Sequence, residues 1–435
     1  MYKLNPPHVY IHQSVAETPR YLARAQRVID GLANTPPVTV YTDDELPVMI
    51  KEQGLLAGQD LWGAIAEPHD PMLLFNSFRF DGRREERLAW LQQETGIGRY
   101  HAAEALTGYG PFCWFSAFPG RGDEFHDDIC RPCWRLHFQN GCAHRCHYCG
   151  LNGLLSTMVN VEDYIAQLDR LIQLNPWQET YLLEDDADVL ILEPELGCLG
   201  PLIEYFGTLD GRYLIIHTKS ANVDWMKDLR HNGNTIIVWS LSGQEQSTRL
   251  EPVCGSMHER IDAARRASEM GYCVRYKFKP IIPMIGWREQ ATEAITAALA
   301  SSKPDLISLC VFMWLRFPTV ERCIDLSLLD PAFVDAARMS DAPGISTRSM
   351  PFPNEMRALV YEHYLNEIAR IDPDIPVSLS TESPDMWKML AGKLKCTPTN
   401  YVCGCGPNSI PNRRQLCCHP YKIAESGPVG GFELM

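Results

Sequence analysis

Gly141-Cys142-Ala143-His144-Arg145-Cys146-His147-Tyr148-Cys149-Gly150 is the stretch that decides the fold. Its three cysteines follow the spacing C-x3-C-x2-C in a loop flanked by glycine. Residues 134–138 before it alternate like a short strand, and residues 159–174 after it repeat apolar side chains at helical intervals. The cysteines are therefore predicted to lie at the C-terminal end of a strand, where a helix follows. In a β/α barrel this is the catalytic face.

Three thiolates on one short loop can hold three irons of a [4Fe–4S] cluster. Cys142, Cys146 and Cys149 are the predicted ligands and catalytic residues. The fourth iron then lacks a protein ligand and can take a substrate or cofactor. A structural zinc loop is the alternative, but zinc prefers four closed ligands and paired C-x2-C units, and no fourth cysteine follows closely. The spacing and its context favour the cluster.

Composition bounds the class of protein. The chain has 435 residues, 16 cysteines and a formal net charge of −14. It begins with no apolar leader and has no apolar run of membrane length, so a cytoplasmic enzyme with reduced cysteines and no membrane partner is expected. An acidic chain repels phosphate backbones on average, which disfavours nucleic acid and favours a small-molecule substrate.

Three regions are predicted along the chain. Residues 1–130 read as an N-terminal α/β region, residues 131–345 as the catalytic region, and residues 346–435 as a C-terminal extension with a cysteine-rich tail. In the middle region five apolar runs, each ending in polar residues, alternate with helical stretches. The runs are Tyr181–Leu183, Tyr213–Ile216, Thr235–Trp239, Val274–Tyr276 and Ile307–Phe312. This alternation predicts a parallel, barrel-like sheet.

Residues from about 134 to 290 resemble the spore photoproduct lyase family of the radical S-adenosylmethionine (SAM) superfamily. The matching motifs are the cysteine loop, His217-Thr218-Lys219, Ser240-Leu241-Ser242, Leu250-Glu251-Pro252 and Lys279-Pro280-Ile281. The resemblance implies a partial (β/α)6 TIM-like barrel, a [4Fe–4S] cluster that binds SAM, and reductive SAM cleavage by a lyase or transferase. It also implies an electron donor such as flavodoxin or ferredoxin.

Cofactor contacts follow from the same resemblance and from the strand ends. Lys219 and Ser240 are expected near the SAM carboxylate, and Glu184 or Asp185 is expected to accept from its ammonium group. Tyr148 is a candidate to flank the adenine. The alternatives are a loop-filling aromatic, a solvated acidic turn, a surface lysine and a helix N-cap. The remaining candidates, for cofactor or substrate contact, are Lys277, Lys279, Trp314 and Arg316.

Two departures from the family pattern bear on the substrate. In the lyases a cysteine after the second barrel strand returns a hydrogen atom to the product, and a tyrosine follows the third cluster cysteine. Here residues 184–188 contain no cysteine, and Gly150 follows Cys149. The sequence therefore predicts a small-molecule substrate in place of a thymine dimer. Lyase-like DNA repair remains an alternative.

The tail is dense in cysteines, and Cys403, Cys405, Cys417 and Cys418 are candidates for a second metal or cluster. Thiolates also bind trivalent arsenic, a soft ion. Transfer of the 3-amino-3-carboxypropyl group of SAM to such an acceptor is therefore an alternative reaction. The pair Cys130 and Cys133 can ligate a metal only with a distant partner pair, and two idle cysteines are the simpler interpretation.

Overall fold

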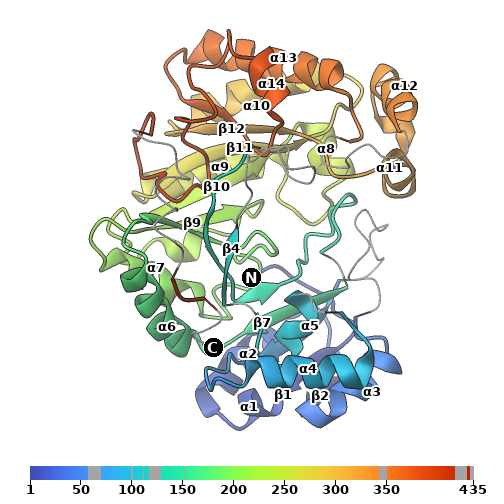
Figure 1. Ribbon diagram of the computed structural model, residues 1–435, viewed down its shortest axis with the longest axis vertical. Helices are drawn as coiled ribbons and strands as arrows, with labels where there is room; N and C mark the ends of the chain where they lie inside the picture. Colours follow the sequence, from blue (N-terminus) through green and yellow to red (C-terminus); the bar gives the residue numbers. More distant parts are fainter. Residues whose placement is uncertain are drawn as a thin grey trace.

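The computed structural model describes residues 1–56, 70–98, 101–110, 112–116, 129–151, 153–341, 350–416 and 429–431. Two sheets with flanking helices make up an α/β fold within these residues (Figure 1). No helix in this described part is long and apolar enough to cross a membrane. The prediction of an α/β fold with parallel strands is confirmed.

The smaller sheet has five strands in the order β2-β1-β3-β7-β6. They are β1 (Val9–His12), β2 (Val38–Tyr41), β3 (Met72–Asn76), β6 (Gln139–Asn140) and β7 (Leu154–Met158). All neighbours are parallel except β6 and β7. The helices near this sheet, at the lower end of Figure 1, are α1 (Gln13–Ala16), α2 (Pro19–Asp30), α3 (Leu46–Lys51), α4 (Arg84–Thr95) and α5 (His101–Leu106). Because β6 and β7 flank the cysteine loop, that loop is anchored to the N-terminal sheet.

The larger sheet has eight strands in the order β13-β12-β11-β10-β9-β8-β5-β4. They are β4 (Cys113–Ser116), β5 (Cys133–Leu136), β8 (Thr180–Leu183), β9 (Tyr213–Thr218), β10 (Thr235–Leu241), β11 (Cys273–Ile281), β12 (Ile307–Val311) and β13 (Val377–Leu379). Every neighbouring pair is parallel except β4 and β5. The five apolar runs predicted to be strands lie in β8 to β12, so that prediction is confirmed. Their carboxyl ends share one edge of the sheet.

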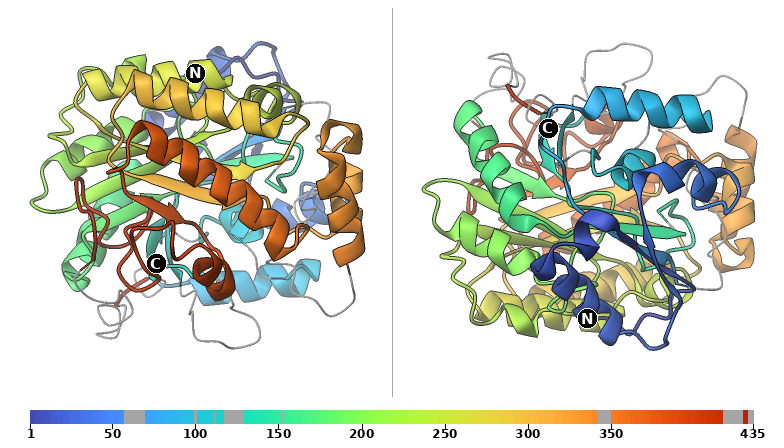
Figure 2. Two further views of the ribbon diagram at one scale, coloured as in Figure 1. Left: turned by 90° about the horizontal axis from the view of Figure 1, so that it is seen from above. Right: turned by 90° about the horizontal axis from the view of Figure 1, so that it is seen from below.

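One face of this sheet is apolar and packs on helices. The covering helices are α6 (Val161–Leu174), α7 (Leu199–Gly207), α9 (Met257–Glu269), α10 (Trp287–Ser301) and α13 (Asn354–Ile371). Figure 2 shows α10 and α13 side by side on the outside of the sheet. The shorter helices α8 (Gln244–Arg249), α11 (Phe317–Cys323), α12 (Pro331–Ser340) and α14 (Pro384–Met389) complete the C-terminal half. Side chains alternate along a strand, so the opposite side of each strand faces away from these helices.

We call that opposite side the second face. Strand register places Arg135, Leu182, Ile215 and Ile236 on it, in a row across β5, β8, β9 and β10. Leu182, Ile215, Ile236 and Val238 form a small buried cluster separate from the main core. Further along β11 this face carries cations, because Arg275 pairs with Val238 and Lys277 pairs with Ser240. The second face is thus apolar at one end and positively charged toward the other.

Candidate active site

The cysteine loop is held at several points of its backbone. Cys142 donates its N–H to the carbonyl of Leu151 over 2.8 Å, and His147 donates to Leu250 over 2.9 Å. Gly141 donates to the carbonyl of Asp186 over 2.9 Å, at a φ of +94°. A Cβ at Gly141 would lie 1.9 Å from the carbonyl oxygen of Leu154, so only glycine fits there. The loop conformation is therefore fixed by its first residue.

The three loop cysteines form no disulfide, and they lie close enough to raise one another's pKa. Burial raises the pKa of Cys149 to about 11, and the nearby Cys146 adds to this rise. Burial also raises the pKa of Cys142, and Asp188, Cys146 and Cys149 add to that rise. Their sulfur atoms do not gather within 4.8 Å of one another. Three thiols on one short loop are the donors that three irons of a [4Fe–4S] cluster would take.

Beside the loop, five polar side chains donate to one carboxylate, and Gln246 Nε2 is one of them, over 3.1 Å to Glu251 Oε1. The side chain of Glu251 is fully buried, and its Oε1 accepts from the Tyr148 hydroxyl over 2.5 Å and from Lys219 Nζ over 3.1 Å. Its Oε2 accepts from Arg260 Nη2 over 2.5 Å and from Ser242 over 3.1 Å. Burial would raise the pKa of Glu251, but Arg260 and Lys219 outweigh it and lower that pKa. The carboxylate therefore stays ionised and fixes both Tyr148 and Lys219.

Lys219 follows β9 directly and reaches the cysteine loop. Its Nζ lies 3.8 Å from Cys146 Sγ and also donates to the hydroxyl of Tyr148. Burial would lower the pKa of Lys219, but the charges of Cys146 and Glu251 prevail and raise it. The structure thus brings together two predicted cofactor contacts, Tyr148 and Lys219, at one predicted cluster ligand.

A second buried carboxylate supports the loop and the end of β9. Asp188 accepts from His144 Nε2 over 2.8 Å, from the Thr218 hydroxyl over 2.9 Å and from the backbone N–H of Lys219 over 2.8 Å. One side chain therefore sets the relative position of the cysteine loop and Lys219.

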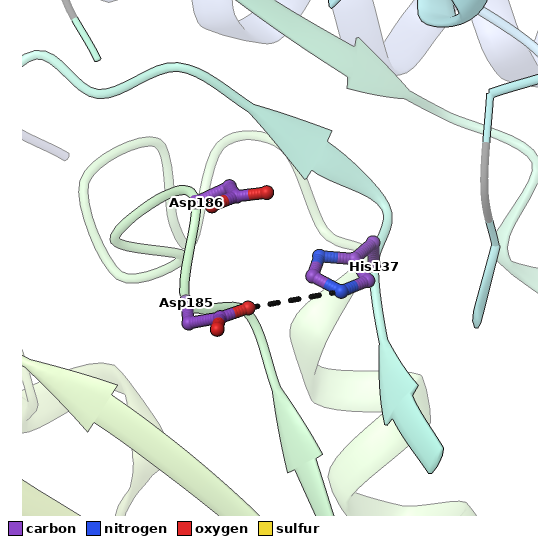
Figure 3. A group of neighbouring side chains, drawn as sticks. All are labelled: His137, Asp185 and Asp186. Carbon is purple, nitrogen blue, oxygen red and sulfur yellow. Dashed lines mark ion pairs between the residues drawn. The ribbon is translucent and has the colours of Figure 1, made fainter. Parts of the chain in front are cut away.

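Glu184 and Asp185 lie at the end of β8, on the side of His137. Glu184 Oε1 accepts from the backbone N–H groups of Phe138 and Gln139, and its Oε2 lies 2.9 Å from His137 Nδ1. Asp185 pairs with Arg135, and its Oδ1 lies 3.8 Å from His137 Nε2. Figure 3 shows Asp185 and Asp186 on the same side of the His137 ring, with the dashed line marking the ion pair of Asp185. Both predicted ammonium acceptors are thus engaged by their own neighbours.

The other predicted contacts lie on β10 and β11. The carbonyl of Ser240 accepts from Arg260 Nη1 over 3.0 Å. Lys279 lies with its Nζ 4.5 Å from the centre of the Trp314 ring. Burial, together with Lys277, lowers the pKa of Lys279.

Some residues of the site were missed by the sequence argument. Glu251 stands in the motif Leu250-Glu251-Pro252 quoted for the family resemblance, and that position was the available signal, whereas Arg260 lies in α9, outside the motifs quoted above. Asp188 lies in the acidic run 184–188, but nothing local separates it from its neighbours. Cys254 Sγ lies 3.6 Å from Cys146 Sγ, so a fourth thiol reaches the loop through space where none follows in sequence.

Of the predicted tail ligands, Cys403 is buried and Cys405 is half-buried. Cys405 packs against the small cluster on the second face. Cys417 and Cys418 lie outside the described residues.

Comparison with known proteins identifies relatives. A family model described as spore photoproduct lyase matches residues 127–313. The spore photoproduct lyase of Bacillus subtilis is 29% identical over 163 residues, which is 36% of this chain and 48% of that protein. That of Clostridium acetobutylicum is 26% identical over 185 residues, 40% of this chain and 55% of that protein. The chain thus spans about half the length of the curated relatives it matches.

Solved structures share the fold. A spore photoproduct lyase mutant with bound AdoMet and dinucleoside spore photoproduct superposes with a TM-score of 0.58 at 17% identity, over 87% of this chain and 99% of that chain. A second spore photoproduct lyase mutant superposes with a TM-score of 0.57 at 17% identity, over the same shares of the two chains.

The prediction of a small-molecule substrate in place of a thymine lesion is wrong. The relatives carry the name of the lyase, and a matching structure holds the dinucleoside photoproduct. The net charge was a poor guide to the substrate because it averages over the whole chain. Burial lowers the pKa of His217, and the nearby cations Lys277, Lys279 and Arg135 lower it further. The net charge hides this local group of cations. The cysteine-free segment 184–188 misled because its carboxylates hold the site together here and do not report on the substrate.

The matched region contains the whole cysteine loop, Lys219 and the Glu251 network. Over residues 127–313 the chain is therefore similar to the spore photoproduct lyases, as their distant homologue.

Proposed function

We propose that this protein is a radical SAM lyase that acts on a spore photoproduct-type thymine lesion in DNA. The proposal rests on the contacts of Lys219 with Tyr148 and Cys146, inside the segment that matches the lyase family. These contacts place the ammonium group of Lys219 and the phenol of Tyr148 beside the loop that would hold the cluster.

The finer architecture is part of the proposal. Strands β5 and β8 to β12 would be the six strands of a partial (β/α)6 barrel, with the cysteine loop at their carboxyl ends. Residues 1–130, 131–345 and 346–435 would be its N-terminal region, its core and its extension. The pairing of β6 and β7 with the N-terminal sheet joins the first two regions around the loop.

Cys142, Cys146 and Cys149 would hold the [4Fe–4S] cluster. With SAM on its open iron, such a cluster supplies an electron that cleaves a carbon–sulfur bond of SAM. Lys219 would pair with the SAM carboxylate as a point charge, kept in place by Glu251. Ser240 would bind SAM at the end of β10, and a flavodoxin or ferredoxin would deliver the electron.

The second face would receive the lesion. Arg135, Lys277 and Lys279 lie close enough to His217 to lower its pKa, so they create a positive region below the cysteine loop. Cations at this place suit a substrate that carries phosphodiester groups at either end. The rest of the chain stays acidic, which limits binding to undamaged DNA.

The test is a product assay. The protein is reconstituted anaerobically with iron and sulfide, reduced with dithionite, and given SAM and dinucleoside spore photoproduct. We expect thymine dinucleoside and cleaved SAM by liquid chromatography and mass spectrometry. Cleavage of SAM with the photoproduct left intact would overturn the proposed substrate, and a protein without iron would overturn the proposed chemistry.

Binding gives an independent readout. A short duplex with one lesion should bind more tightly than the undamaged duplex, and its affinity should fall as salt rises. Equal affinity for both duplexes would contradict the proposal.

A further inference from the structure

Two cysteine pairs that lie far apart in sequence meet at the start of β5. Cys130 and Cys133 enclose Arg131, whose Nη2 donates to the carbonyl of Tyr401 over 2.9 Å and whose guanidinium lies 3.6 Å from the centre of that ring. A Cβ on Gly406 would lie 2.7 Å from Cys403 Sγ and 3.4 Å from Arg131 Cγ. Cys403 and the 130–133 segment therefore both lie beside the α-carbon of Gly406.

The tail segment 403–409 is fastened to the edge of the large sheet at several points. The backbone N–H groups of Glu179 and Thr180 both donate to the carbonyl of Pro407, over 2.8 and 3.0 Å. Arg275 Nη2 donates to the carbonyl of Ser409 over 2.7 Å. These bonds hold the segment across the amino ends of β8 and β11, at the far end from the cysteine loop.

A further hydrogen bond places part of the 403–409 segment against the second face of the sheet. Gly404 donates its N–H to the Ser308 hydroxyl over 3.3 Å, and Cys405 packs on the apolar cluster of the second face. Cys405 therefore lies under the sheet and not on the outer surface. Cys133, at the start of β5, lies on the same face as Arg135, because the two are separated by one residue of the strand.

The thiols of these two pairs affect one another's pKa through their charges. Burial raises the pKa of Cys133 to about 12, and Cys405 and Cys130 add to that rise. The hydrogen bond to Cys405 raises the pKa of Cys403, as do its burial and the presence of Cys130. Burial would lower the pKa of Arg135, but the charges of Cys133, Cys130 and Cys405 outweigh burial and raise that pKa. A common location for all four is the geometric reason.

We propose that Cys130, Cys133, Cys403 and Cys405 hold a second [4Fe–4S] cluster. Four thiolates are the complete ligand set of such a cluster. A tetrahedral zinc would need its sulfurs about 3.8 Å apart, given zinc–sulfur bonds of about 2.3 Å. No three of these sulfurs lie within 4.8 Å of one another, and the same holds for the sulfurs of the cysteine loop. Although Cys403 and Cys405 hydrogen-bond to each other, the four described thiols do not close into the tight set that a tetrahedral zinc requires.

The surroundings suit the charge of such a centre. Four thiolates on a cluster give a net negative charge, and Lys277, Arg135 and Lys279 lower the pKa of Cys405 after its hydrogen bond with Cys403. Because every iron has a thiolate, this cluster has no open position for SAM or substrate. Its role is to fasten the tail to the sheet, since metal bound across two segments joins them.

The first experiment uses full-length protein with Cys142→Ala, Cys146→Ala and Cys149→Ala together. This triple variant removes the loop ligands and leaves the four proposed ligands intact. After anaerobic reconstitution we expect about four irons per chain, against about eight in the wild type. The dithionite-reduced variant should show a [4Fe–4S] electron paramagnetic resonance signal that SAM does not change. A variant with no iron, or with zinc alone, would overturn the proposal.

Further changes in the triple-variant background identify the ligands. Cys403→Ser with Cys405→Ser should abolish the remaining iron, whereas Cys396→Ser, in the same tail, should leave it unchanged. Cys417→Ser with Cys418→Ser should also leave it unchanged, and loss of iron there would overturn the assigned ligand set. If the Cys403 and Cys405 variant fails to fold, Cys130→Ser alone in that background supplies the test by loss of the signal. Retention of the full signal would contradict the proposal.

Discussion

Arg260 Nη2 and Glu251 Oε2 lie 2.5 Å apart, and neither side chain is exposed to solvent. Arg260 also donates to the carbonyls of Gly255 and Ser240. The pair thus ties α9 to the end of β10, and the other oxygen of Glu251 holds Tyr148 and Lys219. One buried ion pair therefore connects the stability of the sheet to the position of the site.

Glu251→Gln should destabilise the protein strongly. The change removes the negative charge and leaves Arg260 and Lys219 buried without a counter-ion. Breaking one partner of a buried pair costs about 3–5 kcal/mol in the free energy of unfolding, to be measured by urea denaturation. The control is Glu204→Gln, whose exposed pair with Arg230 should matter by no more than about 1 kcal/mol. Equal effects of the two changes would contradict the prediction.

Lys219→Met should weaken SAM binding by about tenfold or more, because a hydrogen bond to a charged group contributes about 1.5–3 kcal/mol. The methionine keeps much of the length of the side chain but loses the ammonium group beside Cys146 and Tyr148. Isothermal titration of the reconstituted protein with SAM measures the change. Lys227→Met, on the exposed side of the same connection, is the matched control. Unaltered SAM affinity in the Lys219 variant would show that this lysine does not bind the cofactor.

Gly141→Ala should cost far more stability than Gly96→Ala. Both glycines have positive φ, which costs about 1–2 kcal/mol for an L side chain. Only at Gly141 would the added Cβ also collide with backbone, at the carbonyl of Leu154. The difference between the unfolding free energies of the two variants separates the cost of the steric collision from the cost of the positive φ. The iron content of each variant shows whether the cysteine loop can still bind a cluster. A similar loss in both variants would mean that the loop shifts to admit the methyl group.

Asp43 should make the N-terminal region sensitive to acid. Burial would raise the pKa of Asp43, but hydrogen bonds from His12 and Arg79 outweigh it and lower that pKa. The unfolded state, with a pKa of about 3.9, then binds more protons than the folded state as pH falls. The stabilisation is therefore fully present above about pH 5 and is lost progressively below it.

The measurement for Asp43 is urea unfolding between pH 7 and pH 3. Wild type should exceed Asp43→Asn in stability at pH 7, and the difference should shrink toward pH 3. The exposed neighbour Asp44 provides the control variant, Asp44→Asn. A difference that stays constant across this range would contradict the assigned pKa shift.

The sequence predicts local elements well where the periodicity is strong. The helical repeat over residues 159–174 is α6, and the apolar run Thr235–Trp239 lies in β10. These segments carry their pattern within a few residues. In contrast, the pairing of β7 with β3 depends on segments separated by about eighty residues, and no local pattern specifies it.

The same distinction holds for the site. The spacing of Cys142, Cys146 and Cys149 predicts a shared loop because the three lie within eight residues. Glu184 appeared available to the cofactor, but a turn with φ of +59° aims its carboxylate back at the N–H groups of Phe138 and Gln139. That outcome depends on β5 and β8 being neighbours, which the composition of an acidic run does not reveal.

The docking of residues 403–409 also orders events during synthesis. Thr180 hydrogen-bonds Gly406, which the ribosome adds 226 residues later. Until then a nascent chain leaves the apolar cluster of Leu182 and Ile215 uncovered, although the rest of the sheet is already translated. Residues 403–409 therefore cover the amino ends of these strands late in synthesis, and a chain stopped before residue 403 would expose that hydrophobic surface to chaperones and proteases.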